Sequence, residues 1–132
     1  MIAGMNYMGR PFDRAVSAFI EDIRDRGRED KVLLVCCGEM GRTPRINKKG
    51  GRDHWGNIAP LLLSGGGLEM GQVIGQSTRN VGEPLTTPYR INNPVAAVLN
   101  TPFDIADPRL NHAVPRDIPR AMATYQPIPG PS

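Results

Sequence analysis

The continuous apolar run of residues 32–37 constrains the fold of this chain more than any other feature. It is short, it contains valines, and a lysine and a glycine bound it, which favours a strand over a helix. Because its apolar side chains do not alternate with polar ones, we expect both faces of the strand to be buried, as they are in parallel sheets. A second run, residues 58–63, predicts another strand, and residues 72–74 predict a third, short one.

One amphipathic helix precedes the first strand. Apolar residues between positions 12 and 26 recur at spacings of three and four, which places them on one helical face. Pro11 suits the start of such a helix and Gly27 suits its end. Shorter helices are predicted at residues 94–100 and 118–124. The helical face that should pack against the strand consists of Phe12, Ala15, Val16, Phe19, Ile20 and Ile23.

These elements are too few to complete a domain. Two strands and one amphipathic helix cannot cover both faces of a parallel sheet, which needs a layer on each side. The chain has 132 residues, of which only 39% are hydrophobic and 5% aromatic, so few side chains are available for a core. We therefore expect an α/β protein of which this chain is a C-terminal fragment. Residues 1–100 would belong to the α/β domain, and the proline-rich residues 101–132 would form a tail that packs on its surface.

The charge and the apolar runs exclude two classes of partner. A net charge of +3 is too small a basic bias to predict binding to nucleic acid. The apolar runs are far shorter than the roughly 20 residues that a transmembrane helix needs, so no membrane segment is predicted. The cysteines, Cys36 and Cys37, are neighbours in one predicted strand and point to opposite faces, which argues against a disulfide between them.

The segment of residues 38–56 carries the groups best suited to chemistry. It joins the two predicted strands without any periodic pattern, and loops of that length in compact domains are usually functional or disordered. Between its first and last carboxylates it holds five basic residues and no acid. Carboxylates and imidazoles bind divalent metals, and clustered arginines favour a phosphate or sulfate. The candidate metal ligands are Glu39, Asp53 and His54, and the candidate anion-binding residues are Arg42 and Arg52.

Other interpretations of this segment stay open. It can be a solvated basic surface on which Glu39 pairs with Arg42 or Arg52 while His54 points into solvent. The spacing from Cys36 to Arg42 also matches the phosphate loop of cysteine phosphatases. In that loop, however, Glu39 would place a negative charge inside a nest of backbone N–H groups that binds anions.

Three further features carry weaker signals. The pattern Gly38-x-x-Gly41-Arg42 is similar to a P-loop, but the first glycine and the lysine of that motif are missing. His112 lies beside an asparagine in the proline-rich tail, where a surface histidine is expected rather than a ligand. Trp55 follows the basic segment and is better suited to packing than to covering a ligand.

Several motifs of this region resemble those of a known family. Residues 12–129 are similar to the C-terminal third of a sulfatase-like family of bacterial proteins, the domain of unknown function 1501. That family resembles the alkaline phosphatase superfamily, which implies a doubly wound α/β sheet for the whole protein and an exported, periplasmic location. The motifs are Gly38-Glu39-Met40-Gly41-Arg42-Thr43-Pro44, Gly51-Arg52-Asp53-His54-Trp55, Leu63-Ser64-Gly65-Gly66-Gly67 and Gly71-Gln72-Val73-Ile74-Gly75.

The resemblance implies roles for single residues. In the superfamily a metal-binding Asp-His pair follows a strand of this type, and a later His supplies another ligand. On that pattern Glu39 replaces the Asp and His54 replaces the later His, with Asp53 orienting His54. Met40 stands where the His of the pair would be and cannot act as its substitute. The implied cofactor is a divalent metal, Zn²⁺, Ca²⁺ or Mg²⁺. The nucleophile of the superfamily lies N-terminal to this chain, so no catalytic residue is expected here.

The expected function is therefore that of the C-terminal portion of a sulfatase- or phosphatase-like hydrolase acting on an anionic ester, inactive as this chain alone. Arg42 and Arg52 would hold the anionic substrate. The alternative is a non-catalytic scaffold of the same fold that binds anions or a polysaccharide. The expected partners are an anionic ester or a sulfated polysaccharide and the missing N-terminal portion of the same protein, with no nucleic acid and no membrane.

Overall fold

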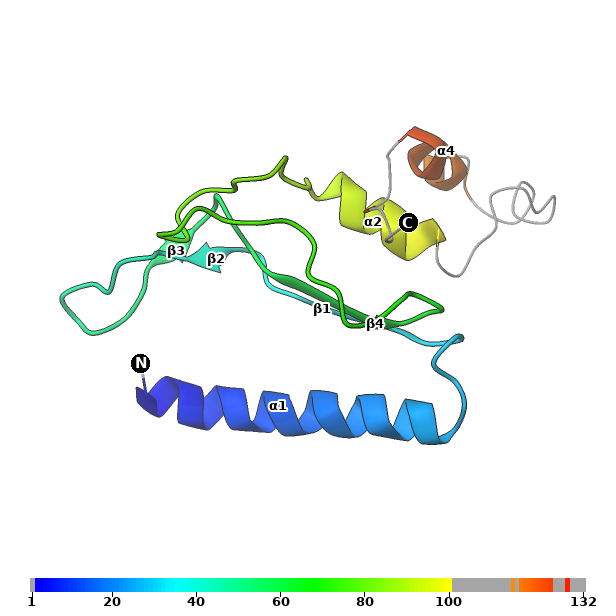
Figure 1. The fold of residues 1–132 in the computed structure, drawn as a ribbon, viewed down its shortest axis with the longest axis horizontal. Coiled ribbons are helices and arrows are strands. Elements are labelled where there is room, and N and C mark those ends of the chain that lie inside the picture. The colour runs from blue at the N-terminus through cyan, green and yellow to red at the C-terminus, as the bar shows by residue number, and fades with distance from the viewer. Residues whose placement is uncertain (1, 101–114, 116, 125–127, 129–132) are drawn as a thin grey trace.

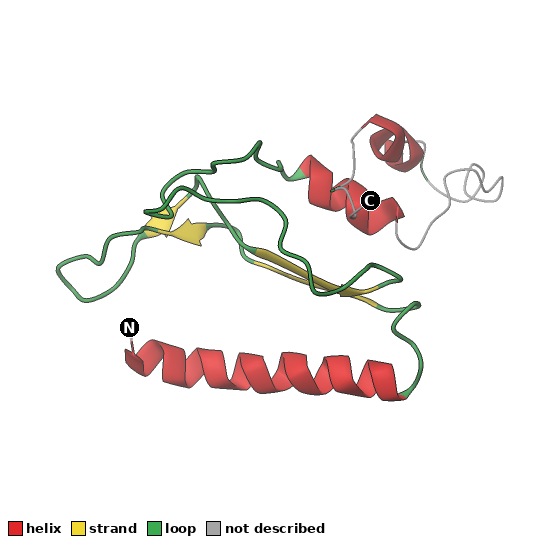
Figure 2. Cartoon of the chain, in the orientation of Figure 1, coloured by secondary structure: helices red, strands yellow, loops and turns green. Residues whose placement is uncertain are grey.

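The structure is a computed structural model that describes residues 2–100, 115, 117–124 and 128. Most of the predicted tail, with His112, lies outside the described residues. Helices and small sheets are mixed, which confirms the α/β class (Figures 1 and 2). The elements are α1 (Ile2–Asp25), β1 (Leu33–Cys37), β2 (Gly41–Arg42), β3 (His54–Trp55), β4 (Leu61–Gly65), α2 (Asn92–Asn100) and α4 (Asp117–Thr124).

Helix α1 begins ten residues earlier than predicted. Pro11 lies inside the helix and not at its start. The apolar spacing of three and four continues upstream through Met5 and Met8, so the helical face that begins at Phe12 is part of a longer stripe. The predicted end is confirmed at Gly27, whose φ is 58°. There the N–H groups of residues 27 and 28 bond carbonyls of the last turn, at 2.9 and 3.0 Å, in the pattern that commonly closes a helix.

Strands β1 and β4 form a ribbon of five residue pairs, from Leu33 opposite Gly65 to Cys37 opposite Leu61. The two strands run antiparallel, so the parallel pairing expected from their apolar composition is wrong. Parallel neighbours need a crossover connection, usually a helix, whereas here the chain between the strands contains only short strands and turns. The C-terminal ends of β1 and β4 therefore lie at opposite ends of the ribbon.

The other predicted elements are confirmed in part. Helices α2 and α4 form where they were predicted, within two residues at each boundary. Strand β4 begins three residues after the predicted start and continues to Gly65. The short strand predicted at residues 72–74 is absent from that described part of the chain, where Val73 is 95% exposed. Its nearest substitute is a single antiparallel bridge between Ser77 and Pro84.

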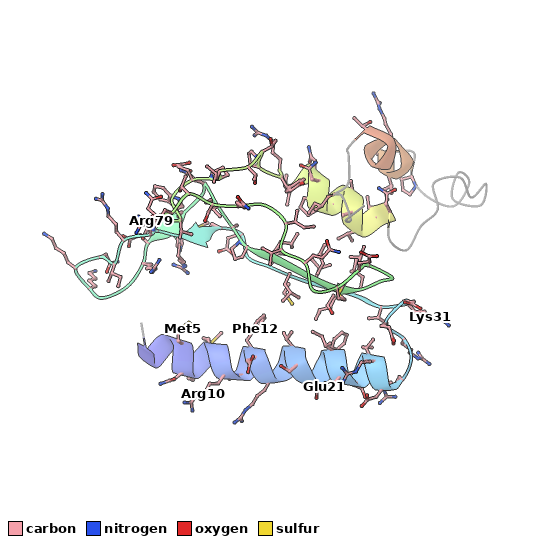
Figure 3. All side chains as sticks on the ribbon, viewed as in Figure 1. Met5, Arg10, Phe12, Glu21, Lys31 and Arg79 are labelled. Atoms are coloured by element: carbon pink, nitrogen blue, oxygen red, sulfur yellow. The ribbon has the colours of Figure 1, made fainter. Side chains whose placement is uncertain are left out.

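The described residues bury little apolar surface. Ala96 and Ala97 of α2 are the only hydrophobic residues among them that are buried. Figure 3 shows Phe12 on the side of α1 that faces the β1–β4 ribbon, yet Phe12 remains 56% exposed and Phe19 42% exposed. Arg10 and Glu21 lie on the opposite side of the helix (Figure 3). The predicted apolar face is thus oriented toward the ribbon but is not closed against it.

Across the described helices, none combines the length and the apolarity that a crossing of the membrane requires.

Candidate functional site

The segment predicted as a long loop folds back on itself as a hairpin. Strands β2 and β3 pair antiparallel, with Gly41 opposite Trp55 and Arg42 opposite His54. The pairing continues beyond the strands, since the Thr43 N–H donates to the Asp53 carbonyl at 2.9 Å. We call residues 41–55 the basic hairpin. It follows the C-terminal end of β1 and precedes β4, so it lies at one end of the ribbon (Figure 1).

The tip of the basic hairpin is organised by one side chain, that of Asn47. Its Oδ1 accepts from the N–H groups of Lys49 and Gly51, at 3.0 Å each, and its Nδ2 donates to Asp53 Oδ1 at 2.8 Å. The backbone N–H of Asn47 also donates to the Gly51 carbonyl at 2.7 Å. Asparagine is favoured in turns because its short amide reaches the backbone two residues on. The segment is therefore an ordered turn and not a loose loop.

The two candidate anion-binding arginines lie on this hairpin and cross-link its two arms. Arg42 Nη1 donates to the Arg52 carbonyl at 3.4 Å, and Arg52 Nη1 donates to the Thr43 carbonyl at 3.1 Å. Both side chains are exposed. A guanidinium has five N–H donors, so each arginine keeps most of its donors for a ligand after these bonds. The hydrogen bonds fix the arginines in place without using up their capacity to bind an anion.

The three candidate metal ligands are placed differently. His54 lies in β3 opposite Arg42, whereas Glu39 lies before β2 and outside the ladder. Both are exposed, and neither side chain makes a hydrogen bond within the described part of the chain. Asp53 is bonded to Asn47 through its carboxylate and to Thr43 through its N–H, rather than to His54. Among the described residues no three His, Cys, Asp or Glu side chains gather so as to hold a metal ion.

The structure also bears on the two other interpretations of residues 38–56, a solvated basic loop and a cysteine phosphatase loop. A pairing of Glu39 with Arg42 or Arg52, expected for a plain solvated loop, does not occur among the described ion pairs, although His54 is exposed as that interpretation required. For the cysteine phosphatase pattern, Cys36 is a free, half-buried cysteine in β1, and Arg42 lies in a strand. The ordered hairpin therefore fits neither alternative fully.

A second segment, residues 79–83, holds the hairpin through hydrogen bonds that were not predicted. The Trp55 indole Nε1 donates to the Gly82 carbonyl at 2.7 Å, and Asn57 Nδ2 donates to Glu83 Oε1 at 2.7 Å. Trp55 is half-buried, which agrees with the packing role expected for it. The same segment contains Arg79, an exposed cation that lies near β3 (Figure 3). The only signal in the sequence was the tryptophan itself, which gives no information on its partner.

The turn that receives Trp55 contains one unfavourable backbone conformation. Val81 has a φ of 58°, a left-handed value that is rare for a β-branched residue, and its side chain is 55% exposed. Val81→Gly should therefore raise the free energy of unfolding by about 1 kcal/mol, because left-handed backbone costs a side-chain-bearing residue roughly 1–2 kcal/mol. Denaturation followed by the fluorescence of Trp55, the single tryptophan, measures this change.

The matched control for that experiment is Val73→Gly. Val73 is 95% exposed and its φ is not positive, so the substitution relieves no strain there. We expect no stabilisation from it. An equal response of both variants to denaturant would show that the conformation of Val81 is not strained.

Comparison with known proteins gives one match. No curated protein and no solved structure matches this chain. The family described as Protein of unknown function (DUF1501) matches residues 3–111. This range contains α1 except its first residue, both small sheets and the whole basic hairpin. The chain therefore belongs to the DUF1501 family.

Proposed function

We propose that this chain supplies the anion-binding part of a sulfatase- or phosphatase-like hydrolase that acts on an anionic ester, and that it is inactive alone. The observation that carries the proposal is the register of the basic hairpin, in which Arg42 lies directly opposite His54. Side chains of directly opposed residues in an antiparallel pair project from the same face, with Cβ atoms about 4.5–5.5 Å apart. A guanidinium and an imidazole thus share one face of the hairpin.

Arg42 and Arg52 suit an ester whose leaving or transferred group is a sulfate or a phosphate. The planar guanidinium matches two oxygens of such a group at once, which a lysine ammonium does not. The backbone bonds described above hold both arginines on the hairpin before a ligand arrives, so less side-chain entropy is lost on binding. Their role in the proposal is to bind and orient the anion.

The proposal includes a divalent metal, Zn²⁺, Ca²⁺ or Mg²⁺, for which this chain would supply only some of the ligands. Glu39 and His54 are exposed and uncommitted, so each is available as a ligand. Asp53 already bonds Asn47, and the described residues do not form a complete set of ligands. The remaining ligands, like the nucleophile, would come from the N-terminal portion of the same protein. When bound, such a metal would activate the nucleophile and stabilise developing charge.

The N-terminal portion of the same protein is the proposed partner of the exposed apolar surfaces. Phe12 and Phe19 of α1 and Val35 and Leu62 of the ribbon are between 37% and 56% exposed, although all four are large and apolar. Val35 and Leu62 lie on opposite faces of the ribbon, since Val35 pairs with Leu63 and Leu62 with Cys36, so apolar side chains are exposed on both faces. Large exposed apolar surface marks an interface in soluble proteins. The same interface would bring the missing catalytic groups to the end of the ribbon that carries the basic hairpin.

The test of the anion site is the binding of inorganic phosphate to the full-length protein by calorimetry. Arg42→Ala should weaken binding by roughly 10- to 100-fold, because hydrogen bonds to charged groups contribute about 1.5–3 kcal/mol and each 1.4 kcal/mol is tenfold in affinity. The control is Arg10→Ala, on the side of α1 that faces away from the ribbon (Figure 3). If the two variants bind phosphate equally well, Arg42 does not hold the anion.

A non-catalytic scaffold is the second candidate. The observation that favours it is that Glu39, Asp53 and His54 do not form a metal-binding group among the described residues. Metal analysis of the full-length protein distinguishes the two candidates. A stoichiometric divalent ion, lost on His54→Ala, supports the hydrolase, whereas protein that binds anions without any metal supports the scaffold.

A further inference from the structure

The tip of the basic hairpin is a projecting and ordered structure. Figure 1 shows the turn between β2 and β3 extending beyond the sheets, away from α2. The hydrogen bonds of Asn47 hold the backbone of this turn at Lys49, Gly50 and Gly51. A rigid turn that carries exposed side chains loses little backbone entropy when it binds a partner. The tip is therefore suited to recognition and is not only a connection between two strands.

The tip carries cations that no side chain among the described residues neutralises. Arg45, Lys48 and Lys49 are exposed, and within the described part of the chain none of their side chains forms an ion pair or a hydrogen bond. Arg42 and Arg52 at the base of the hairpin differ from them, since each donates to a backbone carbonyl. The hairpin thus has a base where arginines are fixed and a tip where the charges are free.

The chemistry of the tip indicates the kind of anion. Residues 43–53 contain no aromatic side chain, and Trp55 nearby uses its indole on Gly82. Proteins that bind single-stranded nucleic acid combine a basic groove with aromatic platforms for the bases, and those platforms are missing here. Lysine ammonium groups act as compact point charges on flexible stems, so they need no fixed bidentate geometry and suit anions spaced along a flexible chain. These features favour a polyanion without bases.

We propose that Arg45, Lys48 and Lys49 bind a sulfated polysaccharide, while the base of the same hairpin holds one of its sulfate esters. This inference rests on the proposed function, because it makes the anionic ester of that site part of a polymer. The tip binds the chain at several sulfates, and Arg42 orients the one that reaches the site. A free sulfate or phosphate ion contacts the base alone.

The experiment compares dextran sulfate with inorganic phosphate as probes of the full-length protein, by calorimetry or fluorescence anisotropy. The double variant Lys48→Ala/Lys49→Ala should lose about tenfold or more in affinity for dextran sulfate and keep its affinity for phosphate. Its plot of log affinity against log salt should flatten by roughly two units, as expected when two fewer cations displace counterions. Neither lysine side chain takes part in the bonds of Asn47, so the turn should stay folded.

The matched control is Arg10→Ala/Arg14→Ala, which removes the same charge from exposed positions of α1. Equal losses of affinity for dextran sulfate in both double variants would overturn the proposal, because binding would then depend on net charge alone. Tighter binding of single-stranded DNA than of dextran sulfate would overturn it as well. The Arg42→Ala variant separates this proposal from the function above. If the proposed function is wrong, Arg42→Ala binds phosphate as tightly as the wild type. If the present proposal is wrong, Lys48→Ala/Lys49→Ala binds dextran sulfate as tightly as the wild type.

Discussion

Replacing Gly41 by alanine is expected to unfold the basic hairpin. Gly41 is buried in β2, and a Cβ at this position would collide with the backbone carbonyl of Ile58 and approach the Trp55 carbonyl to 3.2 Å. Because both neighbours are backbone atoms, the strand or its partner must shift to accept a methyl group. We expect a loss of about 3 kcal/mol in the free energy of unfolding, the upper end of the usual range for overpacked sites. Denaturation followed by Trp55 fluorescence measures it directly, since Trp55 is the residue opposite Gly41.

Gly56→Ala is the matched control for this prediction. Gly56 directly follows β3, a Cβ there would meet no atom within 4 Å, and its φ is not positive. The control should change stability by less than about 0.5 kcal/mol, as most surface substitutions do. If Gly41→Ala were as stable as the wild type, the close approach of β2 to Ile58 would be absent in solution.

The elements that sequence patterns predicted are those with a strong local signal. The spacing of Phe12, Val16, Phe19 and Ile23 fixes one face of α1, and Gly27 terminates it through its left-handed backbone. The start of α1 was misplaced because proline is favoured in the first turn of a helix and disfavoured in its interior, yet Pro11 lies inside α1. Local patterns therefore identify an element and its buried face more reliably than they identify its ends.

The pairing of the strands could not be predicted in the same way. An apolar run of five or six residues fits a strand buried on both faces equally well in either direction of pairing. The direction here depends on what lies between β1 and β4, and β2 and β3 have two residues each, too few to show any alternation. The antiparallel ribbon leaves Val35 and Leu62 partly exposed, which agrees with the expectation that these surfaces need further layers.

The candidate site was predicted as a set of residues but not as an arrangement. Residue types alone indicated Arg42, Arg52 and His54, and the hairpin brings all three together. The organising role of Asn47 and the clamp on Trp55 depend on side-chain bonds to distant backbone groups, which leave no periodic trace in a sequence. Glu39 lies outside the hairpin ladder, since the pairing starts only at Gly41.

Replacing Gly65 by alanine is expected to disrupt the β1–β4 ribbon. Gly65 ends β4 with a φ of 83°, and a Cβ there would collide with the Val32 carbonyl and lie 2.9 Å from the Glu29 carbonyl. The N–H of Gly66 donates to the same two carbonyls, so the turn has no freedom to move away. Backbone strain of about 1–2 kcal/mol and overpacking of about 1–3 kcal/mol add to an expected loss of roughly 2–5 kcal/mol.

Amide hydrogen exchange in β1 and β4 should show this loss as faster exchange throughout the ribbon. Gly67→Ala separates the two causes, because Gly67 has a similar φ of 75° but a Cβ there would meet no atom within 4 Å. In that control only the backbone strain should act, with a loss of about 1–2 kcal/mol in the free energy of unfolding. Equal losses in the two variants would mean that the carbonyls of Glu29 and Val32 do not pack against Gly65. The larger loss at Gly65 would instead show that this close contact holds the end of β4 against the turn that precedes β1.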